Sequence, residues 1–486
     1  IHTNNGVERF RIDSSGNVKV GSAATISPDG DVFFTGVCTA TTLSGAASGL
    51  TGALPAISAA SLTNVPAANV VGVHTSLTIT NATTTGTAVV GGGVTISESG
   101  IEASGIGITC ANINGTQIGG RRNLIINGAM QVAQRSTSST DQTYSTVDRM
   151  RAARVGVDEN PTFSQATLTS AAGPYREGHR KAYKITNGNQ TSGAGSNDVI
   201  AFSTRLEAQD VANSGWDYTQ TNSFITLQFW VKSSVAQNFY IRLFTQDGTQ
   251  KNYPMETGTL TANTWTKVIK TIPGHADLQF DNDANRGLDV DFSVFRGTDQ
   301  TASGVTLDQW ANLDATAKIP DMTSTFYTTN DATFFITGIQ LEVGSQATAF
   351  EHRSVGEELA LCQRYFYRHG DLTGTRSYAL MGVGMIGHNG STDAGKIQIS
   401  APVRMRTQPT ATVIGTTSFI VSTGGGGEGT SDMVCTSAPA LWTAASSDIN
   451  FWVDFNRDSG GSPDQGIACI VHANNNGANI GFDAEL

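Results

Sequence analysis

The sequence predicts a mainly β protein made of several parts, and three observations lead to this fold class. Charged residues make up 15% of the chain, against about a quarter in typical soluble domains, and 54 of the 486 residues are Gly. Runs in which apolar and polar residues alternate recur along the chain, as in strands with one buried face. The length predicts about three domains at roughly 150 residues per domain. A helix-rich enzyme, which would carry many more charged residues, is therefore disfavoured.

The first part, residues 1–37, contains a short repeat. RIDSSGNVKV from Arg11 and TISPDGDVFF from Thr25 align with Gly16 opposite Gly30. Each copy places Ser, Asp and Gly between β-forming residues, and Gly supplies the positive φ that a tight turn needs. We expect two successive β-hairpins. The chain begins at Ile1 within a strand-like pattern, so we expect a fragment or a processed product.

The second part, residues 38–120, has low complexity. From Cys38 to Cys110 the only charged residues are Glu98 and Glu102, and no aromatic residue occurs. Side chains this small bury too little apolar area within one chain to offset an ordering cost of about 1.5 kcal/mol per residue. Either the segment is a disordered linker, or it winds with identical copies. Alternating Val and Ile near its end favour a slender, intertwined β structure.

The third part, residues 121–353, has the pattern of an antiparallel β-sandwich. FITLQFWVK from Phe224 puts Ile225, Leu227, Phe229 and Val231 on one face, and similar runs follow between turn-rich segments. Asp289 and Asp291 share one strand face, for which solvent exposure is the simplest interpretation. DNDANRG from Asp281 departs from the calcium-loop pattern at its sixth and twelfth positions and is interpreted as a solvated turn, with calcium held in another geometry as the alternative.

A short connecting helix is predicted for residues 354–369, and a C-terminal β domain for residues 370–486. Ser354 and Glu357 form a capping box at the helix start, which pairs otherwise unpartnered N–H groups. After residue 370 the strand pattern returns, in KIQIS from Lys396 and INFWVDF from Ile449, with long polar loops. These features predict a β-sandwich.

Charge and cysteine content disfavour several classes of function. With a net charge of -11, the chain as a whole does not attract the negatively charged phosphate groups of nucleic acids, so nucleic-acid binding is disfavoured. No apolar run approaches the ~18 residues of a membrane span, so membrane insertion is not expected. The five cysteines lack metal or redox spacing and are interpreted as reduced structural thiols. We expect no cofactor and no metal.

The chain resembles the tail-fibre and receptor-binding proteins of tailed bacteriophages. The similar segments include RRNLIINGAMQVAQRS from Arg121 and FFITGIQLEVGSQATAFEHRSVGEELALCQRYF from Phe334, while ERFRIDSSGNVKVGS from Glu8 looks like fibre-shaft hairpins. The resemblance covers roughly Arg121 to Phe366. It implies a homotrimeric virion protein, assembled in the host cytoplasm, that contacts other tail or baseplate proteins. It also implies that the sandwich is like carbohydrate-binding jelly rolls.

The predicted binding site lies in the C-terminal domain. INFWVDF places Ile449, Phe451, Val453 and Phe455 on one face and leaves Asn450, Trp452 and Asp454 together on the other. Sugar rings pack their C–H faces on aromatic rings while amides and carboxylates bind their hydroxyls. The same three residues suit a subunit contact equally well. Asn389, Trp442 and Arg457 are candidates from neighbouring loops. Trp230 is interpreted as packing under a loop.

The leading hypothesis is a non-enzymatic tail fibre that mediates host adsorption by binding bacterial surface polysaccharide. No catalytic residues are predicted, because each pair of neighbouring carboxylates has a simpler structural role. Glu357 and Glu358, for example, are explained by helix capping and by the helix dipole. A tailspike depolymerase that cleaves surface polysaccharide is the alternative, and a purely structural head or collar fibre is a third hypothesis.

Overall fold

The computed structural model describes residues 9–22, 24–35, 88–90, 94–97, 100–103, 112–113, 116–117, 121–370, 378–387, 394–414, 418–423, 432–435, 437–460, 466–474 and 477–486. The chain divides into two compact units, Ile1–Ile106 and Gly107–Leu486. All strand pairs between named strands in both units are antiparallel, and the mainly β fold class is confirmed. Asn389 and most of the low-complexity segment lie outside the described residues.

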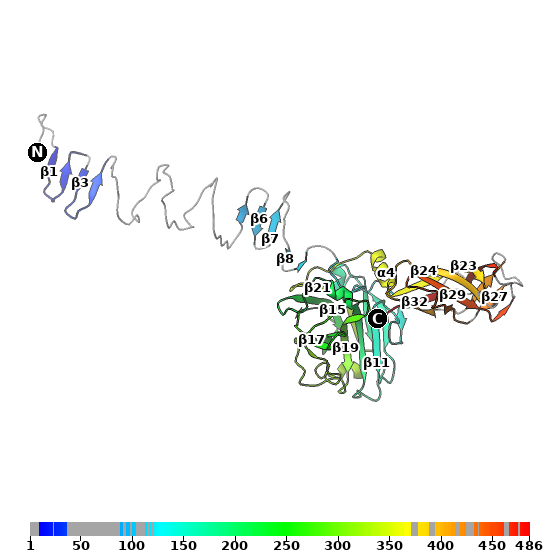
Figure 1. Cartoon of the computed structure of the whole chain (residues 1–486). Helices are drawn as coiled ribbons and strands as arrows, with labels where there is room; N and C mark the ends of the chain where they lie inside the picture. The colour runs from blue at the N-terminus through cyan, green and yellow to red at the C-terminus, as the bar shows by residue number, and fades with distance from the viewer. Residues whose placement is uncertain are drawn as a thin grey trace. The chain divides into compact units, whose positions relative to one another are not determined.

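The first unit contains the two predicted hairpins. They form one four-stranded sheet in the order β1 (Phe10–Ile12), β2 (Val18–Val20), β3 (Ala24–Ile26) and β4 (Val32–Phe34) (Figure 1). Gly16 and Gly30 have φ of 83° and 91°, the left-handed conformation that these turns require. A second sheet of this unit consists of β5 (Ala88–Val90), β6 (Val94–Ser97) and β7 (Gly100–Ala103).

The second unit begins with a short strand pair, β8 (Asn112–Ile113) and β9 (Thr116–Gln117), and continues into a sandwich of two six-stranded sheets. The first sheet has the order β10 (Ser138–Ser139), β12 (Thr162–Thr167), β13 (Lys181–Thr186), β21 (Thr333–Val343), β15 (Phe224–Ser233) and β18 (Thr266–Pro273). The second has the order β11 (Arg151–Val155), β14 (Val199–Glu207), β19 (Arg286–Arg296), β16 (Asn238–Thr245), β17 (Lys251–Thr259) and β20 (Ala311–Asn312).

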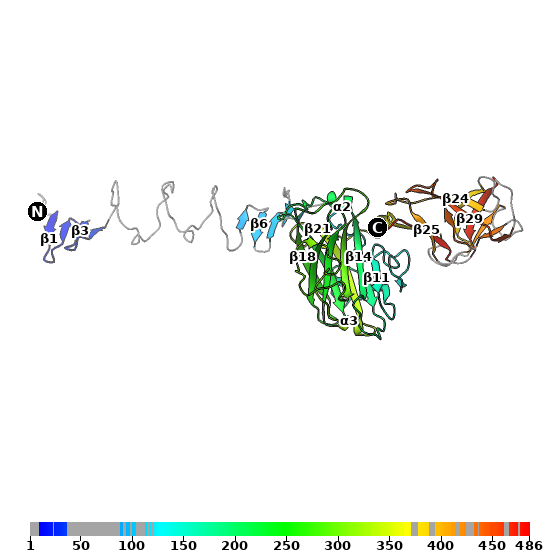
Figure 2. The ribbon, with the colours of Figure 1, turned by 60° about the horizontal axis from the view of Figure 1, so that its bottom comes forward.

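The core between these sheets follows the predicted alternation. Ile225, Leu227, Phe229 and Val231 of β15 are all buried, as are the facing residues of β19. Phe202 and Phe292 stack with ring centroids 4.7 Å apart, and Phe229 meets Phe292 edge to face. Three short helices, α1 (Gly173–Arg176), α2 (Ala208–Ala212) and α3 (Thr325–Thr328), belong to the loops of the sandwich. Figure 2 shows α2 and α3 at opposite ends of its strands.

The expected solvent exposure of Asp289 and Asp291 is wrong, because both are at least nine-tenths buried. Arg286 binds both carboxylate oxygens of Asp289, and Arg296 Nη2 lies 3.0 Å from Asp291 Oδ1. Burial alone would raise the pKa of Asp291, but Arg296 and Arg242 lower it to about 2. The strand pattern showed that the two carboxylates share a face but not that arginines cover that face.

The connecting helix α4 (Val355–Gln363) starts where the capping box predicts and is shorter than expected. Ser354 Oγ accepts from the Glu357 main-chain N–H, and the Glu357 carboxylate accepts from the Ser354 N–H. The helix ends because Tyr365 and Phe366 are drawn into buried contacts: Tyr365 donates its hydroxyl to Glu207, and Phe366 begins β22 (Phe366–Gly370).

The C-terminal domain consists of two further sheets. The smaller has the order β22, β32 (Asn479–Asp483) and β25 (Thr410–Ile414). The larger has the order β28 (Ala440–Leu441), β29 (Asn450–Asn456), β24 (Ala394–Ser400), β23 (Leu380–Ile386), β31 (Ala468–Ala473), β26 (Phe419–Ser422), β27 (Met433–Cys435) and β30 (Ser459–Gly460). A core that includes Phe419, Phe451 and Phe482 lies between them.

The last four residues bind back to the sandwich through three arginines. Arg149 pairs with Glu485, Arg135 pairs with Asp483 at 2.8 Å, and Arg205 donates to the main-chain oxygen of Leu486. Burial alone would lower the pKa of Arg149, but the charge of Glu485 raises it above its ordinary value. The C-terminal domain is thus joined to the sandwich by buried ionic contacts as well as by the chain.

Cys362, Cys435 and Cys469 are free and buried, and burial raises the pKa of each thiol. These three cysteines agree with the interpretation as reduced structural thiols. Within the described ranges, no helix is both long and apolar enough to cross a membrane.

Ser354→Ala should destabilise α4 by about 1 kcal/mol, because it removes the oxygen that caps the first turn. Hydrogen exchange of the amides from Glu357 to Leu361 measures this loss. Ser345→Ala is the matched control, because Ser345 is exposed and its side chain makes no hydrogen bond within the described residues. Equal exchange in the two variants would contradict the assigned helix start.

Candidate functional site

The predicted alternation along β29 is confirmed. Phe451 and Val453 are fully buried and Phe455 nearly so, while the side chains between them are partly exposed. Asn450, Trp452 and Asp454 therefore lie on the outer face of the eight-stranded sheet. We call this surface, together with the residues of β24 and Trp442 described next, the outer platform.

The neighbouring strand β24 supplies partners that the sequence interpretation missed. Ser400, Gln398 and Lys396 lie directly opposite Asn450, Trp452 and Asp454 in register. Lys396 Nζ is 2.7 Å from Asp454 Oδ2, and Ser400 Oγ donates to Asn450 Oδ1 at 2.8 Å. The signal was present in KIQIS, where buried Ile397 and Ile399 alternate with these polar residues.

Trp442 also belongs to the outer platform. Its main-chain N–H donates to the carbonyl oxygen of Trp452 at 2.9 Å. Lys396 Nζ lies 5.5 Å from the centroid of the Trp442 ring, within the range of a cation–π contact. Because Lys396 pairs with Asp454 on the outer face, the Trp442 ring lies on that face too.

Several polar groups of the outer platform form no hydrogen bond within the described part of the chain. The indole N–H of Trp452 donates no hydrogen bond there, and the exposed Gln398 amide makes none. The second carboxylate oxygen of Asp454, Oδ1, is covered and has no hydrogen-bond partner. Leaving a covered acceptor unpaired costs about 1–3 kcal/mol. The platform therefore combines a partly exposed aromatic surface with two side-chain groups that form no hydrogen bond among the described residues, the Trp452 indole N–H and the Gln398 amide.

The other predicted candidates lie elsewhere. Arg457 follows the end of β29 and is partly exposed, and Asn389 lies outside the described residues. Trp230 has a structural role, as expected: its indole N–H donates to Glu177 at 3.0 Å, and its ring packs against Gly173.

An apolar strip borders the outer platform on the far side of β24. Val383 and Met385 of β23 are 67% and 43% exposed, and Met385 lies opposite Lys396. Leu380 and Ile467 add further exposed apolar surface on the same strand and just before β31. This strip is compatible with the second interpretation of Trp452, in which it belongs to a contact between subunits.

No group of three or more His, Cys, Asp or Glu side chains that could hold a metal ion occurs in the portion of the chain that the structure describes.

Comparisons with known proteins give weak similarities. No protein-family model matches the chain, and no curated protein matches it. The enzymatically active domain of tailspike protein 4 of bacteriophage CBA120 is 9% identical over 46% of this chain and 21% of its own, with a TM-score of 0.24. This chain thus spans about a fifth of that tailspike chain.

Two carbohydrate-binding modules are similar to the same extent. The N-terminal cellulose-binding domain of Cellulomonas fimi β-1,4-glucanase C is 10% identical over 45% of this chain and 99% of its own, with a TM-score of 0.21. A family 61 module in complex with β-1,4-galactotriose is 9% identical over 46% of this chain and 100% of its own, with a TM-score of 0.23. Similarities this low do not indicate a ligand or an activity for this chain.

Proposed function

We propose that this chain is the subunit of a homotrimeric phage tail fibre that adsorbs to bacteria by binding a surface glycan without cleaving it. The observation that carries the binding proposal is the outer platform, where Trp452 and Trp442 lie among an ion pair, two amides and a hydroxyl. The resemblance of the segment from Arg121 to Phe366 supports the placement in the virion, next to other tail or baseplate proteins.

The chemistry of the outer platform suits a saccharide. A pyranose ring presents C–H groups on its faces and hydroxyls at its edge, so it pairs with an aromatic surface flanked by hydrogen-bonding groups. The side chains of β29 and β24 that flank Trp452 project from two hydrogen-bonded strands, which hold them at a fixed spacing. A platform of this kind offers modest affinity, and several copies on one fibre raise the avidity by about 10²–10⁴-fold.

The sheet β1–β4 supports self-association. In register, Phe10, Val20, Ala24 and Phe34 form one row and Ile12, Val18, Ile26 and Val32 the next. All eight side chains lie on one face, where Ile12 is 66% and Phe34 52% exposed. Burying such a side chain fully is worth about 1.5–3 kcal/mol. Identical copies of the chain would cover this face with the same apolar rows.

Binding is favoured over cleavage because the paired carboxylates have other partners. Asp289 and Asp291 are held by arginines, Glu357 caps α4, and Glu358 accepts from the Asn127 main-chain N–H. A general acid or nucleophile must instead reach the scissile bond. Incubation with host polysaccharide followed by a reducing-sugar assay tests the alternative of a depolymerase.

Trp452→Ala should abolish adsorption of the purified protein to host cells and leave its unfolding temperature nearly unchanged. Loss of the ring removes the stacking surface, whereas the buried face of β29 keeps its core residues. Trp265→Ala, which changes a tryptophan of the sandwich, is the control and should still adsorb. A folded Trp452→Ala protein that adsorbs normally would refute the site, and one that dissociates would assign Trp452 to a subunit contact.

The purified chain should have three times the 50.9 kDa mass of one subunit by light scattering. Replacing Ile12 and Phe34 by Asp should weaken the assembly, because charge would be buried on the face that copies share. Replacing Arg11 and Thr25 on the opposite face by Asp is the matched control. A folded monomer at micromolar concentration in the unchanged protein would contradict the proposal.

A further inference from the structure

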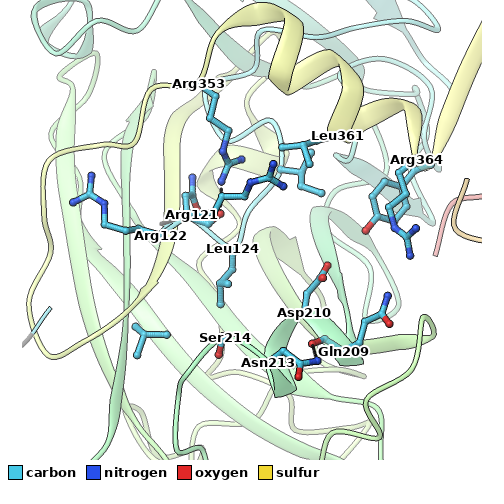
Figure 3. A pocket seen from close by; sticks show the side chains of 14 residues that line it. Arg121, Arg122, Leu124, Gln209, Asp210, Asn213, Ser214, Arg353, Leu361 and Arg364 are labelled. Carbon is cyan, nitrogen blue, oxygen red and sulfur yellow. Dashed lines mark hydrogen bonds between the residues drawn. The ribbon is translucent and has the colours of Figure 1, made fainter. Parts of the chain in front are cut away.

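A cavity of about 500 Å³ lies in the second unit where α2, the start of the sandwich and α4 meet. Figure 3 shows Arg121 and Arg353 on one side and Asp210, Asn213 and Ser214, from α2 and the residues after it, on the other. Its volume falls within the range of about 300–1,000 Å³ that is typical of small-molecule sites. No residue of the outer platform lines it.

Two of the four arginines that line the cavity are neutralised by carboxylates. Arg364 binds both oxygens of Glu207 at 2.7 Å. Arg353 is buried and lies 3.3 Å from Glu351 and 3.4 Å from Glu358. These two guanidinium groups belong to the protein's own ion pairs.

The other two arginines form no ion pair within the described residues. Arg122 donates to Thr348 Oγ1 at 2.8 Å and to the Ala349 carbonyl oxygen at 3.2 Å, both of them neutral acceptors. Arg121 is exposed and makes no hydrogen bond or ion pair within the described residues. Opposite them, the exposed Asp210 carboxylate also has no hydrogen bond or ion pair there. Among the residues that line the cavity, Arg121 and Arg122 thus form no ion pair, and Asp210 is the one carboxylate.

We infer that this cavity binds one sugar residue that carries an anionic substituent, a carboxylate or a phosphate. The anionic group pairs with Arg121 and Arg122, since guanidinium groups bind both classes of oxyanion through charge-assisted hydrogen bonds. The sugar hydroxyls donate to Asp210 across the cavity. Leu124, Val343 and Leu361 supply an apolar wall for the C–H face of the ring.

Two other ligand classes fit less well. A neutral sugar would leave Arg121 and Arg122 without an anionic partner, and a zwitterionic amino acid would bring a positive charge to a lining of four arginines and one carboxylate. An anionic sugar provides an oxyanion for the arginines and hydroxyl donors for Asp210 at the same time. This site goes beyond the proposed function, because it lies in a different domain and uses none of the Trp452 surface.

Ligand-observed NMR titration of the full chain with sodium glucuronate, glucose 6-phosphate and glucose tests the inference. At least one of the two anions should bind at least tenfold more tightly than glucose, and its affinity should fall as salt is added. The tighter of the two identifies the substituent as carboxylate or phosphate. Equal binding of glucose, or no binding of either anion, would overturn the inference.

Variants separate this site from the rest of the molecule. Arg121→Gln and Asp210→Asn should each weaken binding of the anionic sugar about tenfold, as expected for one charge-assisted hydrogen bond. Arg176→Gln is the matched control, because Arg176 is exposed and does not line the cavity. Trp452→Ala should bind the anion normally even if it no longer adsorbs to cells. Unchanged binding in both cavity variants would refute the assignment.

Discussion

A buried guanidinium joins the two domains of the second unit. Arg149 is 1% exposed and has φ of 68°, a conformation that costs a residue with a side chain of order 1–3 kcal/mol. Its charge is paired with Glu485, and its guanidinium carbon lies 3.5 Å from the centroid of the Tyr365 ring. Glu485 is shared with Arg135, which stacks on Phe366 at 3.6 Å. A charge removed from water is tolerated only when it is paired, so Arg149 and Glu485 depend on each other.

The outer platform depends on this contact through the packing between the C-terminal sheets. Glu485 lies two residues after the end of β32, and Phe482 within β32 stacks on Phe451 with ring centroids 4.4 Å apart. Trp452 is the next residue after Phe451 and projects from the other face of β29. A surface held in this way would lose little conformational entropy on binding a ligand. The apolar strip on β23 lies beside the same surface, so a ligand and a second subunit would compete for neighbouring side chains.

Local sequence patterns correctly predicted those structural features that depend on residues close together in the sequence. The hairpins, the faces of β15 and β29 and the capping box at Ser354 follow from two-residue alternation, turn glycines and a three-residue spacing. Features that depend on distant partners were not predictable. The end of α4 depends on the pairing of Phe366 with Asp483, and the burial of Asp291 depends on Arg242 and Arg296. The cavity beside Arg121 brings together residues that no single periodicity connects.

A double-mutant cycle between Arg149 and Glu485 tests whether this ion pair holds the two domains together, with hydrogen exchange of the β32 amides as the measure of opening. Glu485→Gln should lower the opening free energy by about 3–5 kcal/mol, because it leaves the buried charge of Arg149 unpaired. Arg149→Met should lower it by less, because Glu485 keeps its ion pair with Arg135. The double variant should lose far less than the sum, since neither charge remains. Losses that add within about 0.5 kcal/mol would show that the two residues act independently and would contradict the account.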